Sequence, residues 1–268
     1  MLANRVAGRE VNAVYAPRGM ETFGERVSRA LGWPLVIGSP VGRVETCYVV
    51  GMYDPPLYLD TLANTKSATR RVIHWCGSDV STLTRPEVLP EALHLAEWDN
   101  LHDELLAKGI ETHCAPMPTD TLAEVSALPE ARTVGVYLGS DPATYGADVL
   151  EGIIPEMQDA EFVMWRFGES SQDRIADLYR RCRVNLRLTF HDGSCVTPRE
   201  FMRAGRRAVI TARLPYATQV RRDDVPGIVA ALRTALSYDE PDWEAAAYYA
   251  AFNGTERYLS DLRAAGVL

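Results

Sequence analysis

The sequence predicts an α/β fold built from two doubly wound, parallel-sheet domains and a C-terminal helical tail. First, the chain has 268 residues, enough for two compact domains of roughly 100 to 150 residues each. Second, short apolar runs alternate with helix-like segments, and many of these runs are continuous. Continuous apolar runs are typical of parallel strands that are buried on both faces. Third, the alternation stops in a proline-rich stretch near the middle of the chain and then starts again.

Residues 1–118 form the first predicted domain. Helices are expected at Met20–Leu31 and Asp99–Lys108, and Gly109 follows the second of these at the position where a left-handed residue ends a helix. Strands are expected at Val11–Tyr15, Leu35–Ile37, Cys47–Met52, Arg71–His74, Leu93–Ala96 and Glu111–Ala115. Strands that alternate with helices predict a doubly wound sheet.

The stretch from Ala115 to Ala131 contains three prolines and no long apolar run, which indicates a hinge. Residues 132–245 form the second predicted domain, and residues 246–268 a tail with Ala, Tyr and Leu at helical spacing. In the second domain we expect strands at Thr133–Leu138, Glu161–Phe167, Val184–Thr189 and Ala208–Thr211, and helices at Gly146–Met157, Ser171–Arg181 and Thr197–Ala204.

Composition and missing motifs narrow the class of protein. The formal net charge of -8 argues against binding to nucleic acid over the whole surface. Five cysteines without a CxxC pair indicate neither a disulfide framework nor a zinc site. Because we find neither a signal peptide nor eighteen consecutive apolar residues, we expect a cytoplasmic protein without a membrane span. GxGxxG, GxxxxGK[ST] and GxSxG motifs are absent, which argues against dehydrogenases, P-loop proteins and serine hydrolases.

The segment between residues 182 and 211 is the most informative for chemistry. Its strand ends at Thr189 and is followed by the turn His191-Asp192-Gly193-Ser194, after which a helix begins near Pro198. This loop therefore lies at the carboxyl edge of a parallel sheet, where ligands bind in open α/β folds. Asp192 and Glu200 can both accept hydrogen bonds from the hydroxyls of a polyol there, and the helix N-terminus can receive a phosphate.

The stretch LRLTFHDGSCVTPREFMRAGRRAVIT resembles the nucleotide-sugar-binding segment of retaining GT-B glycosyltransferases, family 4 and its relatives. In that family an acid and, after seven residues, a Glu precede a helix of small residues and a strand. The resemblance implies that Asp192 lies on the sugar side and that Glu200 holds the ribose hydroxyls. Here Asp replaces the more common Glu at the first position. The upstream Leu186–Thr189 stretch is similar to an Arg-Pro-Thr variant, which implies that Arg187 contacts the donor diphosphate. The implied donor-binding residues are Arg187, His191, Gly193, Ser194 and Glu200.

A second segment, VIHWCGSDV at residues 72–80, resembles the His-Gly-Ser/Thr-Asp segment in the acceptor-side domain of the same enzymes. Trp75 and Cys76 are two extra residues within that pattern. The resemblance implies that His74 and Asp79 face the cleft between the domains and that His74 lies near the donor sugar. Together with Asp192 they complete the set of implied catalytic residues.

The resemblance implies the transfer of a sugar from a UDP- or GDP-linked donor to a hydroxyl acceptor, with retention of configuration. The acceptor is a glycan, a small molecule or a modified DNA base; the last would make the protein a phage-type transferase acting on hydroxylated DNA bases. We expect no cofactor and no metal, since no DxD motif is present. A non-catalytic sugar- or nucleotide-binding protein of the same fold is the alternative from another class. The oligomeric state is not predicted.

Each implied site residue also has a purely structural interpretation. Asp192 and Glu200 can stabilise a helix N-terminus, an effect of about 0.3 to 1 kcal/mol. His74 can be a core histidine with satisfied hydrogen bonds, and Asp79 can cap a helix or turn. Arg187 lies in an apolar strand, where an unpaired charge is costly, so it can pair with Asp192 rather than with a substrate.

Overall fold

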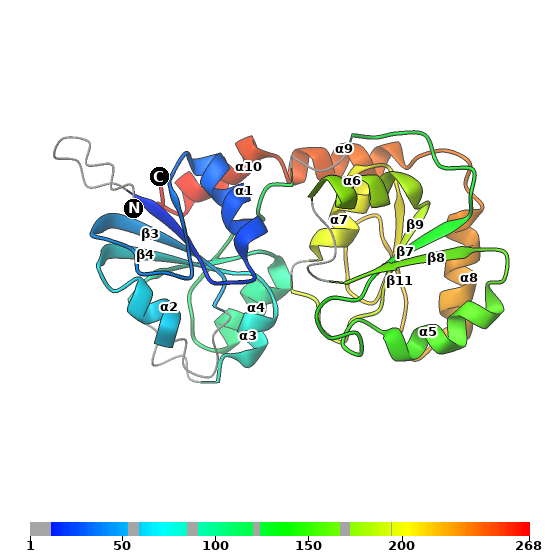
Figure 1. The fold of residues 1–268 in the computed structure, drawn as a ribbon, viewed down its shortest axis with the longest axis horizontal. Helices are drawn as coiled ribbons and strands as arrows, with labels where there is room; N and C mark the ends of the chain where they lie inside the picture. Colours follow the sequence, from blue (N-terminus) through cyan, green and yellow to red (C-terminus); the bar gives the residue numbers. More distant parts are fainter. Residues whose placement is uncertain (1–11, 53–58, 85–90, 120–123, 167–171, 194) are drawn as a thin grey trace. The chain divides into compact units, whose positions relative to one another are not determined.

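A computed structural model describes residues 12–52, 59–84, 91–119, 124–166, 172–193 and 195–268. The chain divides into two compact units (Figure 1): unit 1 contains residues 1–118 and 255–268, and unit 2 contains residues 119–254. The first stretch of unit 1 ends at the same residue as the first predicted domain. The predicted tail is divided, because its first part belongs to unit 2 and its last part to unit 1.

Unit 1 contains a parallel sheet of six described strands in the order β2-β1-β3-β4-β5-β6. The strands are β1 (Ala13–Ala16), β2 (Leu35–Ile37), β3 (Val44–Val50), β4 (Ala68–Trp75), β5 (Leu93–Ala96) and β6 (His113–Cys114). The helices are α1 (Glu21–Leu31), α2 (Leu59–Asn64), α3 (Ser78–Thr82), α4 (Asp99–Ala107) and α10 (Thr255–Ala264). The strand predicted at Val11–Tyr15 begins at a residue outside the described part of the chain.

The two faces of this sheet are buried by different helices. Side chains of α1 and α10, including Val27, Tyr258 and Leu262, pack with Val14, Tyr48 and other strand residues in one core cluster. The opposite face packs against α3 and α4 in a second cluster. Burial on both faces explains why the strands read as continuous apolar runs in the sequence.

Unit 2 contains a parallel sheet of five described strands in the order β11-β10-β9-β7-β8. Helices α5 and α8 pack on one face, and α6 and α7 pack on the other. The strands are β7 (Thr133–Tyr137), β8 (Glu161–Trp165), β9 (Val184–Arg187), β10 (Arg207–Ile210) and β11 (Thr218–Gln219). The helices are α5 (Ala147–Ile153), α6 (Gln172–Arg181), α7 (Val196–Arg203), α8 (Val225–Leu236) and α9 (Trp243–Phe252), with a 3-10 turn at Ile154–Glu156.

Both sheets have the same doubly wound strand order. In each unit the first strand of the sheet lies between the second and the third, so the direction of winding reverses between the first and third strands. This topological switch point lies at the carboxyl ends of β1 and β3 in unit 1 and of β7 and β9 in unit 2. Ligands of open α/β sheets bind at such points. The predicted fold class, two doubly wound α/β domains with C-terminal helices, is confirmed.

The chain crosses between the units next to residues 118 and 254. On the unit 2 side the two crossing segments are hydrogen-bonded, since the Thr119 amide donates to the Asn253 carbonyl oxygen over 3.0 Å. The predicted hinge segment continues in unit 2, where the buried guanidinium of Arg206 donates to the Ser126 carbonyl oxygen over 2.8 Å. Within the described ranges no helix is both long and apolar enough to span a bilayer.

Candidate functional site

The switch point of unit 2 is marked by a buried arginine. Arg187 is the last residue of β9, and β9 pairs with β7 in a register that places Leu186 beside Val136. The Arg187 guanidinium lies 5.9 Å from the ring centre of Tyr137 and 4.9 Å from that of Tyr145. Because cation–π contacts stabilise a buried guanidinium, the two tyrosines fix this charge at the sheet edge.

Asp192 is the partner of this arginine. Its carboxylate accepts from Nε of Arg187 and, over 3.0 Å, from Nη2, so the contact is bidentate. The same carboxylate accepts from the Cys195 amide over 2.9 Å and lies 3.4 Å from Oγ1 of Thr189. Burial raises the pKa of Asp192, but the Arg187 charge and the hydrogen bonds more than offset this and hold the pKa below its ordinary value. Asp192 is therefore an ionised group that ties the loop to the end of β9.

The loop has a constrained backbone next to this ion pair. Cys195, which precedes the first turn of α7, has a left-handed φ of 44°. Burial, followed by the charge of Asp192, raises the pKa of the Cys195 thiol well above its ordinary value, so this cysteine is not an activated nucleophile. Gly146, with a φ of 89°, packs beneath the same strand end: a Cβ placed there would lie 2.6 Å from Cβ of Leu188.

Glu200 lies within α7 and is 3% exposed. The hydroxyl of Tyr179 in α6 donates to its Oε2 over 2.5 Å. Tyr179 is itself buried, and its ring packs 4.6 Å from that of Phe201. Sequence reasoning missed Tyr179, because the two residues of this hydrogen bond are 21 positions apart and nothing in the local pattern connects them.

The structure thus brings Arg187 and Asp192 into direct contact and places Glu200 on the helix that follows the same loop. Gly193 is buried in this loop, and His191 is partly exposed. Ser194 lies outside the described residues. The structural interpretation of Arg187, an ion pair with Asp192, is confirmed. The contact of Arg187 with a diphosphate stays a prediction, as do the donor-binding roles of the other residues.

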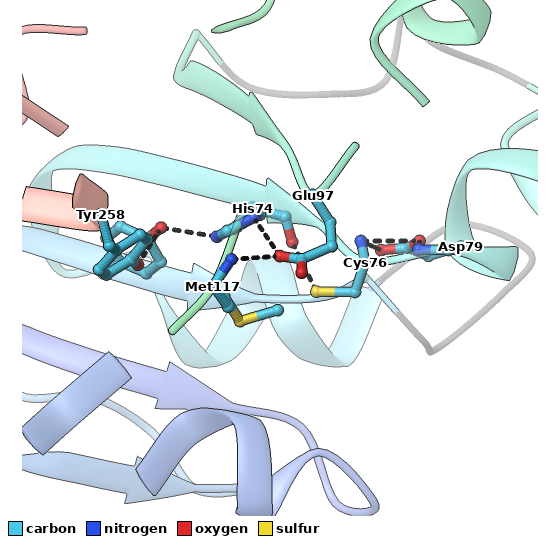
Figure 2. Close-up of polar contacts among 8 residues, drawn as sticks. His74, Cys76, Asp79, Glu97, Met117 and Tyr258 are labelled. Carbon is cyan, nitrogen blue, oxygen red and sulfur yellow. Dashed lines mark hydrogen bonds and ion pairs between the residues drawn. The ribbon is translucent and has the colours of Figure 1, made fainter. Parts of the chain in front are cut away.

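His74 lies in unit 1 on β4, and its side chain is fully buried (Figure 2). Tyr258 donates to the Tyr48 hydroxyl over 2.7 Å, and the Tyr48 hydroxyl lies 2.7 Å from Nδ1 of His74. Nε2 of His74 lies 3.3 Å from Oε2 of Glu97. Both ring nitrogens therefore face groups of unit 1.

Asp79 is also buried, at 1% exposure, and its carboxylate is surrounded by backbone amides. It accepts from Gly77 over 2.7 Å, from Met52 over 3.1 Å and also from Cys76 and Val80. Burial raises its pKa, and these N–H groups lower it, with a net rise. The carboxylate joins the end of β3 to the turn between β4 and α3, at the switch point of unit 1.

For both residues the geometry favours the structural interpretation. The side chains of His74 and Asp79 are engaged by neighbours within unit 1 (Figure 2). Their catalytic roles, implied by resemblance, stay predictions. Three residues from other segments of the chain hold His74 in place and carry no sequence signal of their own: Tyr48 in β3, Glu97 after β5 and Tyr258 in α10.

Metal ligands are not grouped in the part of the chain that the structure describes. Among those residues no three His, Cys, Asp or Glu side chains are arranged so that they could hold a metal ion. All five cysteines are described, and they are free thiols.

The two-sheet architecture is that of GT-B glycosyltransferases. The lipopolysaccharide outer core galactosyltransferase WaaB, in its apo form, matches with a TM-score of 0.64 and 10% identity, covering 95% of this chain and 99% of WaaB. TarM, known from Staphylococcus aureus, matches with a TM-score of 0.59 and 11% identity over 84% of this chain and 55% of TarM. The pneumococcal O-GlcNAc transferase GtfA, in complex with UDP and GlcNAc, matches with a TM-score of 0.53 and 10% identity over 90% of this chain and 58% of GtfA.

These identities establish the fold alone. The chain spans little more than half the length of TarM and GtfA and nearly the full length of WaaB. No protein-family model and no curated protein sequence matches the chain.

Proposed function

We propose that the protein transfers a sugar from a nucleoside-diphosphate sugar, UDP- or GDP-linked, to a hydroxyl acceptor. One observation carries the proposal: the buried Arg187–Asp192 pair and the Glu200-bearing helix stand at the switch point of unit 2, in a fold shared with sugar transferases. GtfA is a transferase that was solved with UDP and GlcNAc, and a TarM variant was solved with UDP, which supports a nucleotide-linked donor.

In this proposal the ribose and the sugar of the donor bind at opposite ends of the loop. Glu200 accepts the ribose hydroxyls, which are good donors to a buried carboxylate. The loop at His191 and Gly193, with the carboxylate of Asp192 behind it, faces the sugar. Because Asp192 neutralises Arg187, we assign most of the stabilisation of the leaving diphosphate to loop and helix amides, with Arg187 as a secondary contributor.

The proposal includes retention of configuration and independence from metal, both taken from the resemblance of the segment at residues 186–211. At this loop the Asp192 carboxylate is engaged by Arg187 and by the Cys195 amide, and the Cys195 thiol is buried with a raised pKa, so neither group is poised to act as a nucleophile. Transfer without a covalent sugar–enzyme intermediate is therefore the form of the reaction that fits this loop.

A second candidate function is binding of a nucleotide sugar without turnover. It is favoured by one observation: His74 and Asp79, the implied catalytic residues of unit 1, are buried and engaged within that unit. Neither His74 nor Asp79 is therefore exposed to act on a donor that binds in unit 2.

A transfer assay separates the two candidates. The protein is incubated with radiolabelled UDP- and GDP-linked hexoses and with one acceptor of each class: a glycan, a small polyol and DNA containing hydroxymethylated bases. Labelled product and stoichiometric release of nucleoside diphosphate support the transferase, and NMR of the product reports the anomeric configuration. Donor binding in calorimetry without product from any acceptor supports the binding protein.

A further inference from the structure

Tyr179 is a residue that neither the segment resemblance nor the proposed chemistry uses. It lies in the last turns of α6, is 2% exposed, and directs its hydroxyl at Oε2 of Glu200 over 2.5 Å. A buried tyrosine hydroxyl needs a hydrogen-bond partner. Here the partner is the carboxylate to which the proposed function assigns the ribose.

The tyrosine is held rigidly. Its ring lies in a core cluster with Trp165, Leu178, Cys182 and Phe201. The carbonyl oxygen of Tyr179 also accepts from Nε of the buried Arg206 over 3.1 Å, which fixes the backbone at this point of α6. A hydroxyl on such a ring has little freedom, so it fixes the orientation of the carboxylate that it contacts.

We infer that Tyr179 is the positioning residue of the donor site: its hydroxyl orients the Glu200 carboxylate toward the two ribose hydroxyls. The inference rests on the proposed function, because it needs a nucleotide at Glu200. Without the hydroxyl the carboxylate loses one of the hydrogen bonds that orient it, and part of the binding energy is spent on ordering it.

The preference for ribose over 2′-deoxyribose distinguishes the positioning role from a general packing role, because a loss of packing alone would not change this preference. Binding of UDP, GDP and ADP is compared with binding of their 2′-deoxy counterparts by calorimetry, for the unaltered protein, Tyr179→Phe and Glu200→Gln. Phenylalanine keeps the ring in its cluster, and Tyr238→Phe, which alters a half-exposed tyrosine of unit 2, is the matched control. Thermal unfolding shows that each variant is folded.

We expect the unaltered protein to prefer the ribose form by about tenfold or more, since hydrogen bonds to charged groups are among the strong ones. Tyr179→Phe should reduce that preference by about five- to tenfold, Tyr238→Phe should leave it unchanged, and the double variant Tyr179→Phe/Glu200→Gln should lose no more than Glu200→Gln alone. A full ribose preference in folded Tyr179→Phe overturns the positioning role while the proposed function stands. If the unaltered protein binds none of the three nucleotides, the proposed function is overturned and the positioning role with it.

An independent observation in unit 1 carries a second inference. The buried side chains of Glu97, His74, Tyr48 and Tyr258 form a chain of polar contacts within unit 1. Figure 2 shows Glu97, His74 and Tyr258 of this chain. Glu97 also accepts the Met117 amide over 2.8 Å, one residue before unit 1 ends at Pro118. Tyr258 lies in the first turn of α10, which begins at Thr255, where the chain re-enters unit 1.

We propose that this network cooperatively stabilises the two chain segments that leave unit 1, near Met117 and near Tyr258, and that His74 connects them. The His74 ring stacks on that of Tyr258, with ring centres 6.5 Å apart, so His74 lies on the sheet face that α10 covers. Polar groups that contact one another in a buried network are coupled, so loosening one end should loosen the other.

The coupling is measured by amide hydrogen exchange in Tyr258→Phe. Exchange in α10 should rise, and exchange at the Met117 amide, which donates to Glu97 at the other end of the network, should rise about five- to tenfold as well. Tyr15→Phe, a buried tyrosine of the same sheet that accepts from Asn64, is the control and should alter neither segment. If Tyr258→Phe proves unfolded, Tyr48→Phe is used in its place. Unchanged protection of Met117 in a folded variant of either tyrosine overturns the inference.

Discussion

The carboxylate of Asp192 accepts hydrogen bonds from both Nε and Nη2 of Arg187 at the carboxyl end of β9. Both side chains are buried, so each charge depends on the other for its stability inside the protein. The pair therefore sets the shape of the loop that the proposed donor must meet, before any ligand is present.

The first prediction concerns this ion pair. Asp192→Asn should lower the free energy of unfolding by about 3 kcal/mol at neutral pH, because it leaves a buried guanidinium without its counter-charge. Asp159→Asn, which breaks an exposed ion pair with Arg132, should cost less than about 1 kcal/mol. Urea denaturation of the two variants provides the measurement, and equal costs would contradict the account.

The pH dependence of the same pair follows from the lowered pKa of Asp192. A carboxyl whose pKa is lower in the folded than in the unfolded protein stabilises the fold fully above its unfolded value of about 3.9, and loses this contribution as the pH falls through the folded value. The stability difference between the unaltered protein and Asp192→Asn should therefore be constant above about pH 5 and shrink below about pH 4. A difference that grows on acidification would contradict this sign.

A further prediction separates two roles of His74. Because its side chain is fully buried and both ring nitrogens face partners, His74→Gln should lower stability by about 1 to 3 kcal/mol and leave nucleotide affinity unchanged. His113→Gln, on an exposed histidine of the same unit, is the control. Thermal unfolding and calorimetry decide the outcome: unaltered stability with a large loss of turnover would restore His74 as a catalytic residue.

Metal dependence gives another test of the proposed chemistry. If loop amides and Arg187 meet the charge of the leaving diphosphate, sugar transfer should continue in excess EDTA. Loss of activity in EDTA and recovery with magnesium or manganese would show that a metal ion does this work. The assay uses the labelled donor and acceptor that give product with untreated protein.

Gly146 offers a test of the strand end that carries the ion pair. Its φ of 89° is unfavourable for other residues, and a Cβ would approach Leu188 to 2.6 Å. Gly146→Ala should therefore lower stability by about 1 to 3 kcal/mol. Gly42→Ala, where a Cβ would meet no atom within 4 Å, should have little effect, and denaturation curves compare the two.

Most of the sheet framework could be predicted from the sequence, because parallel strands buried on both faces leave continuous apolar runs such as Val184–Thr189. The helix α8 was not predicted, although Asp224 caps it and Pro226 stands in its first turn. The short elements α2, α3 and β11 were also missed, since a few residues give no clear periodicity. The burial of Arg206, whose guanidinium binds backbone carbonyls near residue 126, was not predicted either.

The candidate site was predictable only where its parts are close in sequence. Asp192 lies five residues from Arg187, and their pairing follows from the cost of burying an unpaired arginine in an apolar strand. Tyr179 and Glu200 come from two helices, and Tyr258 reaches Tyr48 across 210 residues. Such contacts depend on how helices pack on the sheet, which local patterns do not encode.

Glu200 is the residue on which the proposed nucleotide site of unit 2 depends most directly. Calorimetric titration of UDP, GDP and ADP should show binding of at least one of them to the unaltered protein. Glu200→Ala should weaken that binding by about ten- to a hundredfold, since charge-assisted hydrogen bonds are worth roughly 1.5 to 3 kcal/mol. Glu244→Ala, on an exposed glutamate of the same unit, should leave the affinity unchanged. Equal affinity of folded Glu200→Ala and the unaltered protein would contradict the assignment of the donor site.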